Sequence, residues 1–140
     1  MASRQLLMTL FKLQKRAART IANVPRRTES APLFESLKLL TVFELYNFKI
    51  CMFMFKYYTQ RVAPSVKEMF TKTSDITKRD TRQSNKYYIP FTHLETVKKS
   101  LRRRGAKIWN FIFDKIDMNC SMCVFKHKIK NYLVQNQIPD

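Results

Sequence analysis

The stretch TVFELYNFKICMFMFKYY, from Thr41 to Tyr58, decides the fold that this sequence predicts. Its first four residues, Thr41 to Glu44, match a capping box. In that motif the threonine hydroxyl accepts a hydrogen bond from the amide three residues on, and the glutamate reaches back to the N-cap amide. The second half is apolar on nearly every side of a helix, which is typical of a central helix rather than a surface one. We therefore expect a long central helix from about Val42 to Gln60.

An amphipathic helix is expected before it, from about Arg4 to Ala22. Its apolar residues recur at the spacing of one helix face: Leu6, Leu10, Leu13, Ala17 and Ile21. Its cations lie mostly off this stripe: Lys12, Lys15, Arg16 and Arg19. The helix should end before Pro25, because a residue that precedes proline disfavours the α conformation. We expect the apolar stripe to pack on the rest of the protein.

Further helices are expected on both sides of the basic middle of the chain. One helix should have Pro32 at its first position. Three others should run over about Ser65–Phe70, Ala106–Phe113 and Ser121–Val134. Gly105, the only glycine, is predicted to be a turn or a helix boundary, because a residue without a Cβ can adopt positive φ. Large aromatic residues of these helices are assigned to packing: Phe53, Phe55, Trp109 and Phe111.

The helical patterns stop between residues 71 and 99, where the sequence is polar and basic. We expect a basic irregular loop there that stays mobile without a partner, with a short extended piece around Pro90. The predicted organisation is a helical segment at 1–70, this basic loop at 71–99, and a C-terminal helical segment at 100–136 that packs on the first. The predicted fold class is mainly α, a small helical bundle interrupted by a basic irregular loop.

The charge balance predicts a polyanionic partner. The 140 residues include 27 Lys and Arg against 10 Asp and Glu, for a formal net charge of +17. Nucleic acid is the first candidate partner and an anionic membrane surface the second. No apolar run is long enough to predict a transmembrane helix. Three cysteines, an odd number, suit a reducing compartment, so we expect an intracellular protein of the cytoplasm or nucleus.

The sequence does not predict catalysis. Two-metal nucleotidyl transfer needs carboxylates that converge on the ions, and no two aspartates are adjacent in this chain. Asp114 and Asp117 are interpreted as solvated surface acids beside Lys115. A single glycine cannot supply a Gly-rich phosphate loop, and neither histidine has a nucleophile and an orienting group at a suggestive spacing. We therefore expect no enzyme activity and no cofactor.

Cys120, Cys123 and His127 have the spacing C-x2-C-x3-H, which resembles a fragment of a zinc knuckle. A structural zinc site takes four ligands in a tetrahedron. The fourth would have to come from Cys51 or His93, which are far away in the sequence. Small cysteines on one side of a helix give the same pattern when they are merely packed. We therefore expect no metal site and keep these three residues only as candidate ligands.

Basic residues are the remaining signal for function. The candidate phosphate contacts in the second half of the chain are Arg79, Arg82, Lys98, Lys99, Arg102, Arg103 and Arg104. Four residues of the N-terminal helix would extend this basic face: Lys12, Lys15, Arg16 and Arg19. Cations of this kind contact phosphates and release counterions. The interleaved Tyr87, Tyr88 and Phe91 either stack on unpaired bases or anchor the loop to the core.

Five blocks follow one another along the chain: LQKRAARTI (13–21), SAPLFESLKLLTVFELYNFKICMFMFKY (30–57), TRQSNKYYIP (81–90), SLRRRGAKIWN (100–110) and FKHKIKNYLVQN (125–136). In this order and spacing they resemble the C-terminal region of endonuclease–reverse transcriptase proteins from non-LTR retrotransposons of the jockey and chicken-repeat type. The resemblance covers nearly the whole chain, from about Leu10 to Asn136.

The resemblance implies a detached, transposon-derived C-terminal piece of an RNA-directed DNA polymerase. In that family the catalytic block with its Tyr/Phe-x-Asp-Asp motif and the endonuclease lie upstream, and no position of this sequence matches a catalytic residue. The resemblance implies contact with RNA or DNA and with the rest of the polymerase protein. Some related elements carry a four-ligand zinc knuckle, which the spacing of Cys120, Cys123 and His127 does not complete.

Two alternatives stay open. In the first, the chain is an inert structural remnant of a decayed transposon reading frame that once packed on the polymerase. The apolar helix at 42–60 would then need a lost partner surface. In the second, the N-terminal helix belongs to a basic membrane-surface protein or to a mitochondrial presequence, since Met1 to Thr28 holds seven cations and no acid.

Overall fold

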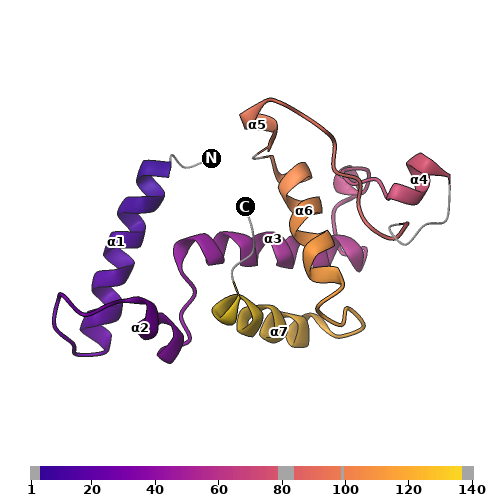
Figure 1. Ribbon diagram of the computed structural model, residues 1–140. Coiled ribbons are helices and arrows are strands. Elements are labelled where there is room, and N and C mark those ends of the chain that lie inside the picture. The colour runs from indigo at the N-terminus through magenta and orange to yellow at the C-terminus, as the bar shows by residue number, and fades with distance from the viewer. Residues whose placement is uncertain (1–3, 79–83, 99, 137–140) are drawn as a thin grey trace. The chain divides into compact units, whose positions relative to one another are not determined.

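The computed structural model describes residues 4–78, 84–98 and 100–136, and these are mainly helical (Figure 1). The elements are α1 (Arg4–Ile21), α2 (Ala31–Ser36), α3 (Val42–Tyr58), the 3-10 turn η1 (Pro64–Val66), α4 (Thr73–Thr77), α5 (Glu95–Lys98), α6 (Leu101–Phe113) and α7 (Met122–Gln135). Extended structure within the described ranges is limited to one isolated antiparallel bridge. The expected mainly α fold, a small helical bundle, is confirmed.

The chain divides into two compact units. The first comprises Met1–Phe48 and Lys126–Asp140, and the second comprises Lys49–Phe125. These bounds differ from the segments expected at 1–70, 71–99 and 100–136, because α3 and α7 each run across a unit boundary.

The predicted capping box at the start of α3 is confirmed. The Thr41 amide donates to Glu44 Oε2 at 2.7 Å, and the Glu44 amide donates to Thr41 Oγ1 at 3.3 Å. At the other end, Gln60 has a φ of 59° and the Arg61 amide donates to the Lys56 carbonyl, which closes the helix. Five residues in the second half of α3 are buried, as expected of a central helix: Ile50, Cys51, Met54, Phe55 and Tyr57.

In the first unit, α1 packs through a different face from the one expected. Phe11 lies against the rings of Phe34 and Phe43, and Ala18 is buried. Gln14 donates to the Leu40 carbonyl at 2.7 Å and accepts from the Val42 amide at 3.0 Å. The packed face of α1 therefore includes a polar side chain that satisfies backbone groups next to the start of α3.

The prediction that the apolar stripe of α1 (the leucine stripe: Leu6, Leu10, Leu13, Ala17 and Ile21) packs on the rest of the protein is wrong. Its four large members are exposed by between 51% and 66%: Leu6, Leu10, Leu13 and Ile21. Helical periodicity establishes that these residues share a face, but it does not establish that the face is covered. Gln14, Phe11 and Ala18 lie on the neighbouring face, and that face is the one the unit buries.

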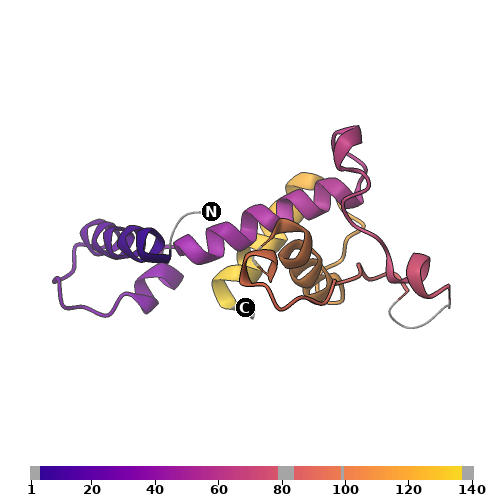
Figure 2. The ribbon, with the colours of Figure 1, turned by 90° about the horizontal axis from the view of Figure 1, so that it is seen from above.

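In the second unit, α6 lies against the C-terminal half of α3 in both ribbon views (Figure 1, Figure 2). Ile108, Trp109 and Ile112 of α6 are buried. Trp109 also lies near Tyr58, and the rings of Phe55 and Phe125 are stacked with centroids 4.1 Å apart. The assignment of Trp109 and Phe55 to the core is confirmed.

The prediction that Gly105 forms a turn or helix boundary is wrong. Gly105 is buried within α6, which begins at Leu101 rather than at Ala106, and φ at Gly105 is not positive. A Cβ at this position would lie 3.0 Å from Met54 Sδ and 3.2 Å from the Phe70 ring. The missing side chain therefore permits a close approach of α6 to α3 rather than a special backbone conformation.

The described part of the basic segment 71–99 is held by hydrogen bonds. The Thr73 amide donates to the Lys86 carbonyl and the Tyr88 amide donates to the Thr71 carbonyl, each at 2.9 Å. Just before this segment, the Tyr57 hydroxyl donates to the Lys67 carbonyl and accepts from the Phe70 amide. In place of the helix expected at about 65–70, the chain forms the short turn η1 and then this tyrosine-held stretch.

Candidate nucleic-acid interface

The three consecutive arginines occupy the first turn of α6. Ser100 is the N-cap residue, with φ −63° and ψ 148°, and its hydroxyl accepts from the Arg103 amide at 3.4 Å. The first turn contains no acid. A helix N-terminus already has a partial positive charge, so Arg102, Arg103 and Arg104 add cations to the end of the helix where cations are least favourable.

The three arginine side chains differ in exposure. Arg102 is exposed, whereas Arg103 and Arg104 are half-buried. The Nη1 atom of Arg103 is shielded from solvent and has no hydrogen-bond partner among the residues that the structure describes. Burial of a guanidinium nitrogen without a hydrogen-bond partner costs free energy.

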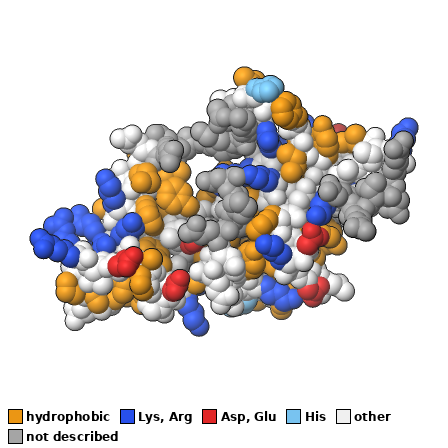
Figure 3. All heavy atoms as spheres, in the orientation of Figure 1, with side chains coloured by type: hydrophobic (Ala, Val, Ile, Leu, Met, Phe, Trp, Pro, Cys, Tyr) orange, Lys and Arg blue, Asp and Glu red, His pale blue; other side chains and the backbone are white. Residues whose placement is uncertain are grey.

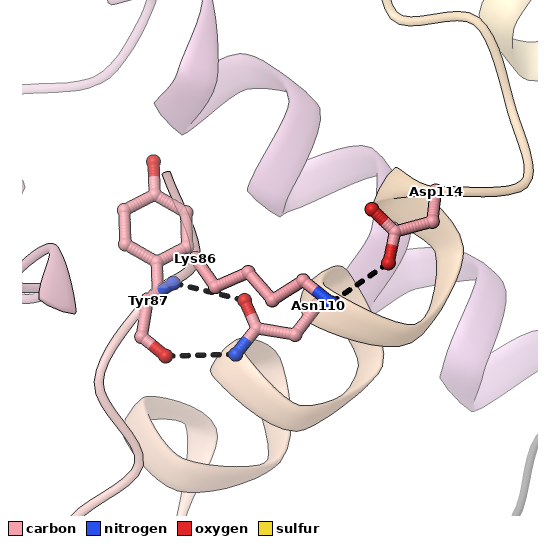
Figure 4. Close-up of polar contacts among 4 residues, drawn as sticks. All are labelled: Lys86, Tyr87, Asn110 and Asp114. Carbon is pink, nitrogen blue, oxygen red and sulfur yellow. Dashed lines mark hydrogen bonds and ion pairs between the residues drawn. The ribbon is translucent and has the colours of Figure 1, made fainter. Parts of the chain in front are cut away.

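Asn110 and Asp114 of α6 contact Tyr87 and Lys86 of the preceding segment, as Figure 4 shows. The Tyr87 amide donates to Asn110 Oδ1 at 2.9 Å, and Asn110 Nδ2 donates to the Tyr87 carbonyl at 2.7 Å. Lys86 Nζ forms an ion pair with Asp114 at 2.7 Å. Asp114 therefore contacts a distant lysine, and the cation beside it, Lys115, lies over the Phe111 ring at 3.7 Å.

The interleaved aromatic residues divide into two groups. Tyr87 is buried against the rings of Tyr57 and Phe70, and burial raises the pKa of its hydroxyl to about 12, with Tyr57 and Tyr58 adding to the shift. Tyr88 is exposed, and Phe91 is 79% exposed, with its ring centroid 4.8 Å from that of His93. Tyr87 is thus an anchor, whereas Tyr88 and Phe91 present ring surface to solvent.

The other predicted phosphate contacts near α6 are only partly placed. Lys98 is the last residue of α5, which contacts α6. Arg79, Arg82 and Lys99 lie outside the described residues. Lys107 was not among the predicted contacts, yet it is exposed on α6 one turn after Arg103. The helical spacing of Arg103 and Lys107 could have revealed it.

The basic residues of α1 belong to the other compact unit, the one that comprises Met1–Phe48 and Lys126–Asp140. Lys12 and Arg16 are exposed. Lys15 Nζ lies 4.3 Å from the centre of the Phe11 ring, and Arg19 Nε donates to the Thr28 carbonyl at 2.8 Å. On the face that Figure 3 displays, Lys and Arg side chains gather over the end of α1 and the loop after it, beside hydrophobic ones.

The candidate zinc ligands are not brought together. Cys120 precedes α7 and its thiol donates to the Asp117 carbonyl, while Cys123 and His127 are exposed on α7. No group of three His, Cys, Asp or Glu side chains able to hold a metal occurs within the described part of the chain. Cys51 is fully buried, and desolvation raises the pKa of its thiol to about 12.

Sequence reasoning missed the residues that organise this surface. Ser100 could have been found, because serine is a preferred N-cap residue and stands directly before the arginines. The pairs Tyr87–Asn110 and Lys86–Asp114 could not, since each joins residues more than twenty positions apart.

No helix within the described ranges is both long enough and apolar enough to span a bilayer. Comparison of the chain with protein-family models, with curated proteins and with solved structures gave no match. Function is therefore inferred from the chain's own residues.

Proposed function

We propose that this chain is a non-catalytic nucleic-acid-binding module that contacts phosphates of RNA or DNA through the first turn of α6. Arg102, Arg103 and Arg104 are the proposed contacts in the described part of the chain. Lys98, Lys99, Arg79 and Arg82 stay candidates beside them. No catalytic residue and no cofactor are assigned.

The observation that carries the proposal is that three arginines lie in the first turn of α6, at the end of the helix dipole that is partially positive. The first turn of α6 contains no acid, and Arg103 Nη1 has no hydrogen-bond partner among the described residues. Backbone amides and guanidinium groups there attract the same ligand, an anion. A nucleic-acid backbone supplies repeated phosphates, and its neutralisation releases counterions.

The exposed rings of Tyr88 and Phe91 support single-stranded nucleic acid as the ligand. Aromatic side chains of single-strand-binding proteins stack on unpaired bases, an interaction that tolerates any base sequence. Bases of a closed duplex have no free face to offer these rings. We therefore expect tighter binding to a single strand than to a duplex of the same length.

The proposal includes an origin and a location. The five blocks of sequence resemble the C-terminal region of a non-LTR retrotransposon reverse transcriptase protein, and contact with the rest of such a protein is proposed with it. An intracellular location, in the cytoplasm or nucleus, suits the odd number of cysteines. The inert-remnant alternative stays open, although much of the apolar surface of α3 is buried within this chain.

Filter binding of the full chain to a single-stranded RNA tests the proposal. The variant Arg102→Ala/Arg103→Ala/Arg104→Ala should bind roughly tenfold or more weakly, because three phosphate contacts are removed. The matched control is Arg26→Ala/Arg27→Ala/Arg61→Ala, which removes three exposed arginines and the same charge. Equal weakening of both variants would mean that net charge, rather than the first turn of α6, determines binding.

Arg103 and Arg104 are half-buried, so the triple variant needs a check of its fold. Circular dichroism and melting of the triple variant provide this check. Arg102→Ala alone avoids the problem, because Arg102 is exposed and its removal should leave both measurements unchanged. A folded Arg102→Ala variant with wild-type affinity for RNA would count against the proposal.

A further inference from the structure

The leucine stripe of α1 is a second surface that nucleic-acid binding does not use. Leu6, Leu10, Leu13 and Ile21 are each more than half exposed, and Ala17 lies among them, also exposed. Their spacing continues over about four helical turns, roughly 22 Å along the helix axis. A continuous exposed apolar strip of this length on one helix marks an interaction site rather than scattered surface residues.

The helix cannot simply turn this stripe inward. Its neighbouring face is fixed by both hydrogen bonds of the Gln14 amide, to the Leu40 carbonyl and the Val42 amide. Phe11 packs on the same side against Phe34 and Phe43. Rotation of α1 to bury the leucines would break these contacts and leave backbone groups beside α3 without partners.

The charges around the stripe select the kind of partner. Lys12 and Arg16 are exposed on the side of the stripe away from the packed face. Residues 1–28 contain seven cations and no acid. A second copy of the helix would bring like charges together. A nucleic-acid backbone would match the cations but would leave the leucines in water.

We propose that α1 lies in the surface of a bilayer that contains anionic lipids. The leucine stripe enters the boundary of the acyl chains, and Lys12 and Arg16 stay at the level of the anionic headgroups, where long basic side chains extend back to water. One polar basic face and one apolar face on a helix too polar to span a membrane are the features of an interfacial helix. This surface is independent of α6 and of the proposed nucleic-acid binding.

The apolar part of the proposal is tested by vesicle co-sedimentation of the full chain. Leu10→Ala/Leu13→Ala should lower partition into vesicles containing phosphatidylserine by roughly tenfold or more, since two inserted side chains are shortened. The matched control is Ile76→Ala/Val124→Ala, which shortens two exposed apolar residues of the other unit and should leave partition unchanged. All four residues are exposed, so circular dichroism should remain that of the wild type.

The charge part is tested in the same assay. Lys12→Gln/Arg16→Gln should weaken partition by about fivefold for each cation removed, and wild-type protein should not sediment with vesicles of phosphatidylcholine alone. Arg61→Gln/Lys67→Gln removes the same charge from exposed positions elsewhere and should have a much smaller effect. Arg102→Ala should keep vesicle binding while it weakens RNA binding.

Two results would overturn the proposal. Wild-type partition of Leu10→Ala/Leu13→Ala would mean that the bilayer attracts the protein only through its net charge. A wild-type dimer, detected by light scattering and abolished in the same variant, would mean that a second copy covers the stripe.

Discussion

The helices α1 and α6 have similar sequence patterns, but the apolar face of α6 is buried and that of α1 is exposed. Both are basic, and both have apolar residues at the spacing of one helix face. In α6 that face is buried around Trp109, Ile108 and Ile112. In α1 the leucine stripe is exposed, and a neighbouring face with Gln14 is packed. The comparison teaches that periodicity identifies a face, whereas the complementary surface decides whether that face is covered.

The surface that covers the apolar face of α6 includes Met54 and Phe70, which lie against Gly105. The absence of a Cβ lets the helix approach Met54 and Phe70 closely, and Ile108, Trp109 and Ile112 follow on the same face. On α1 the residues that meet the rest of the unit are Phe11, Gln14 and Ala18. Local shape and hydrogen bonding, rather than hydrophobicity alone, therefore set which side is packed.

The two faces should differ most in how much the free energy of unfolding falls when a large side chain is removed. Trp109→Ala should destabilise the second unit by about 3–5 kcal/mol, because a buried indole is replaced by a cavity. Leu13→Ala on the exposed stripe should change the unfolding free energy by less than about 0.5 kcal/mol. Urea unfolding followed by circular dichroism measures both. Comparable losses in the two variants would contradict the assignment of the stripe as exposed.

A smaller effect is expected from added volume. Gly105→Leu should destabilise the second unit by about 1–3 kcal/mol, because the new side chain meets Met54 and Phe70. Ala17→Leu, which places the same side chain on the exposed stripe, should be nearly neutral. Trp109 is the only tryptophan, so its fluorescence during unfolding reports on the second unit. A neutral Gly105→Leu would show that α6 does not approach α3 closely.

The smallest effect concerns alkaline pH. Burial raises the pKa of Tyr87 from 10.0 and that of Cys51 from 9.0, each to about 12. A raised folded-state pKa gives stability that is complete below the unfolded value and is lost as pH rises toward the folded one. Stability of the second unit should therefore decline from about pH 9 toward pH 12.

Tyr87→Phe keeps the buried ring and removes the titrating hydroxyl. Its stability should decline less than that of the wild type between about pH 10 and pH 12, with Cys51 responsible for the remaining loss. Trp109 fluorescence in urea at a series of pH values measures both proteins. Identical pH dependence in the two would mean that the Tyr87 hydroxyl is not desolvated.

The parts of the fold that could be predicted from the sequence are local. The capping box of Thr41 and Glu44 is confirmed because both partners stand within four residues. The packing of Trp109 and Phe55 is confirmed because large apolar side chains have few stable places outside a core. The prediction for Gly105 is wrong, because a glycine at the edge of a helical pattern is compatible with either a helix end or a close approach of two helices.

The candidate site was predictable only in its residue types. The sequence indicates arginines before Gly105, but their place in the first turn of α6 depends on where that helix begins. The separation of Tyr87 as an anchor from the exposed Tyr88 and Phe91 depends on Asn110, a residue of a different element. Contacts between distant segments of this kind leave no local pattern in a single sequence.

The most direct test of the central claim is the salt dependence of binding to single-stranded RNA. The logarithm of the association constant should fall linearly with the logarithm of salt concentration. Arg102→Ala/Arg103→Ala/Arg104→Ala should make this slope shallower by about two, as expected when three phosphate contacts are lost from a single strand. The control Arg26→Ala/Arg27→Ala/Arg61→Ala should retain the wild-type slope. Wild-type binding that does not weaken at high salt, or an unchanged slope in the α6 variant, would contradict phosphate binding by the first turn of α6.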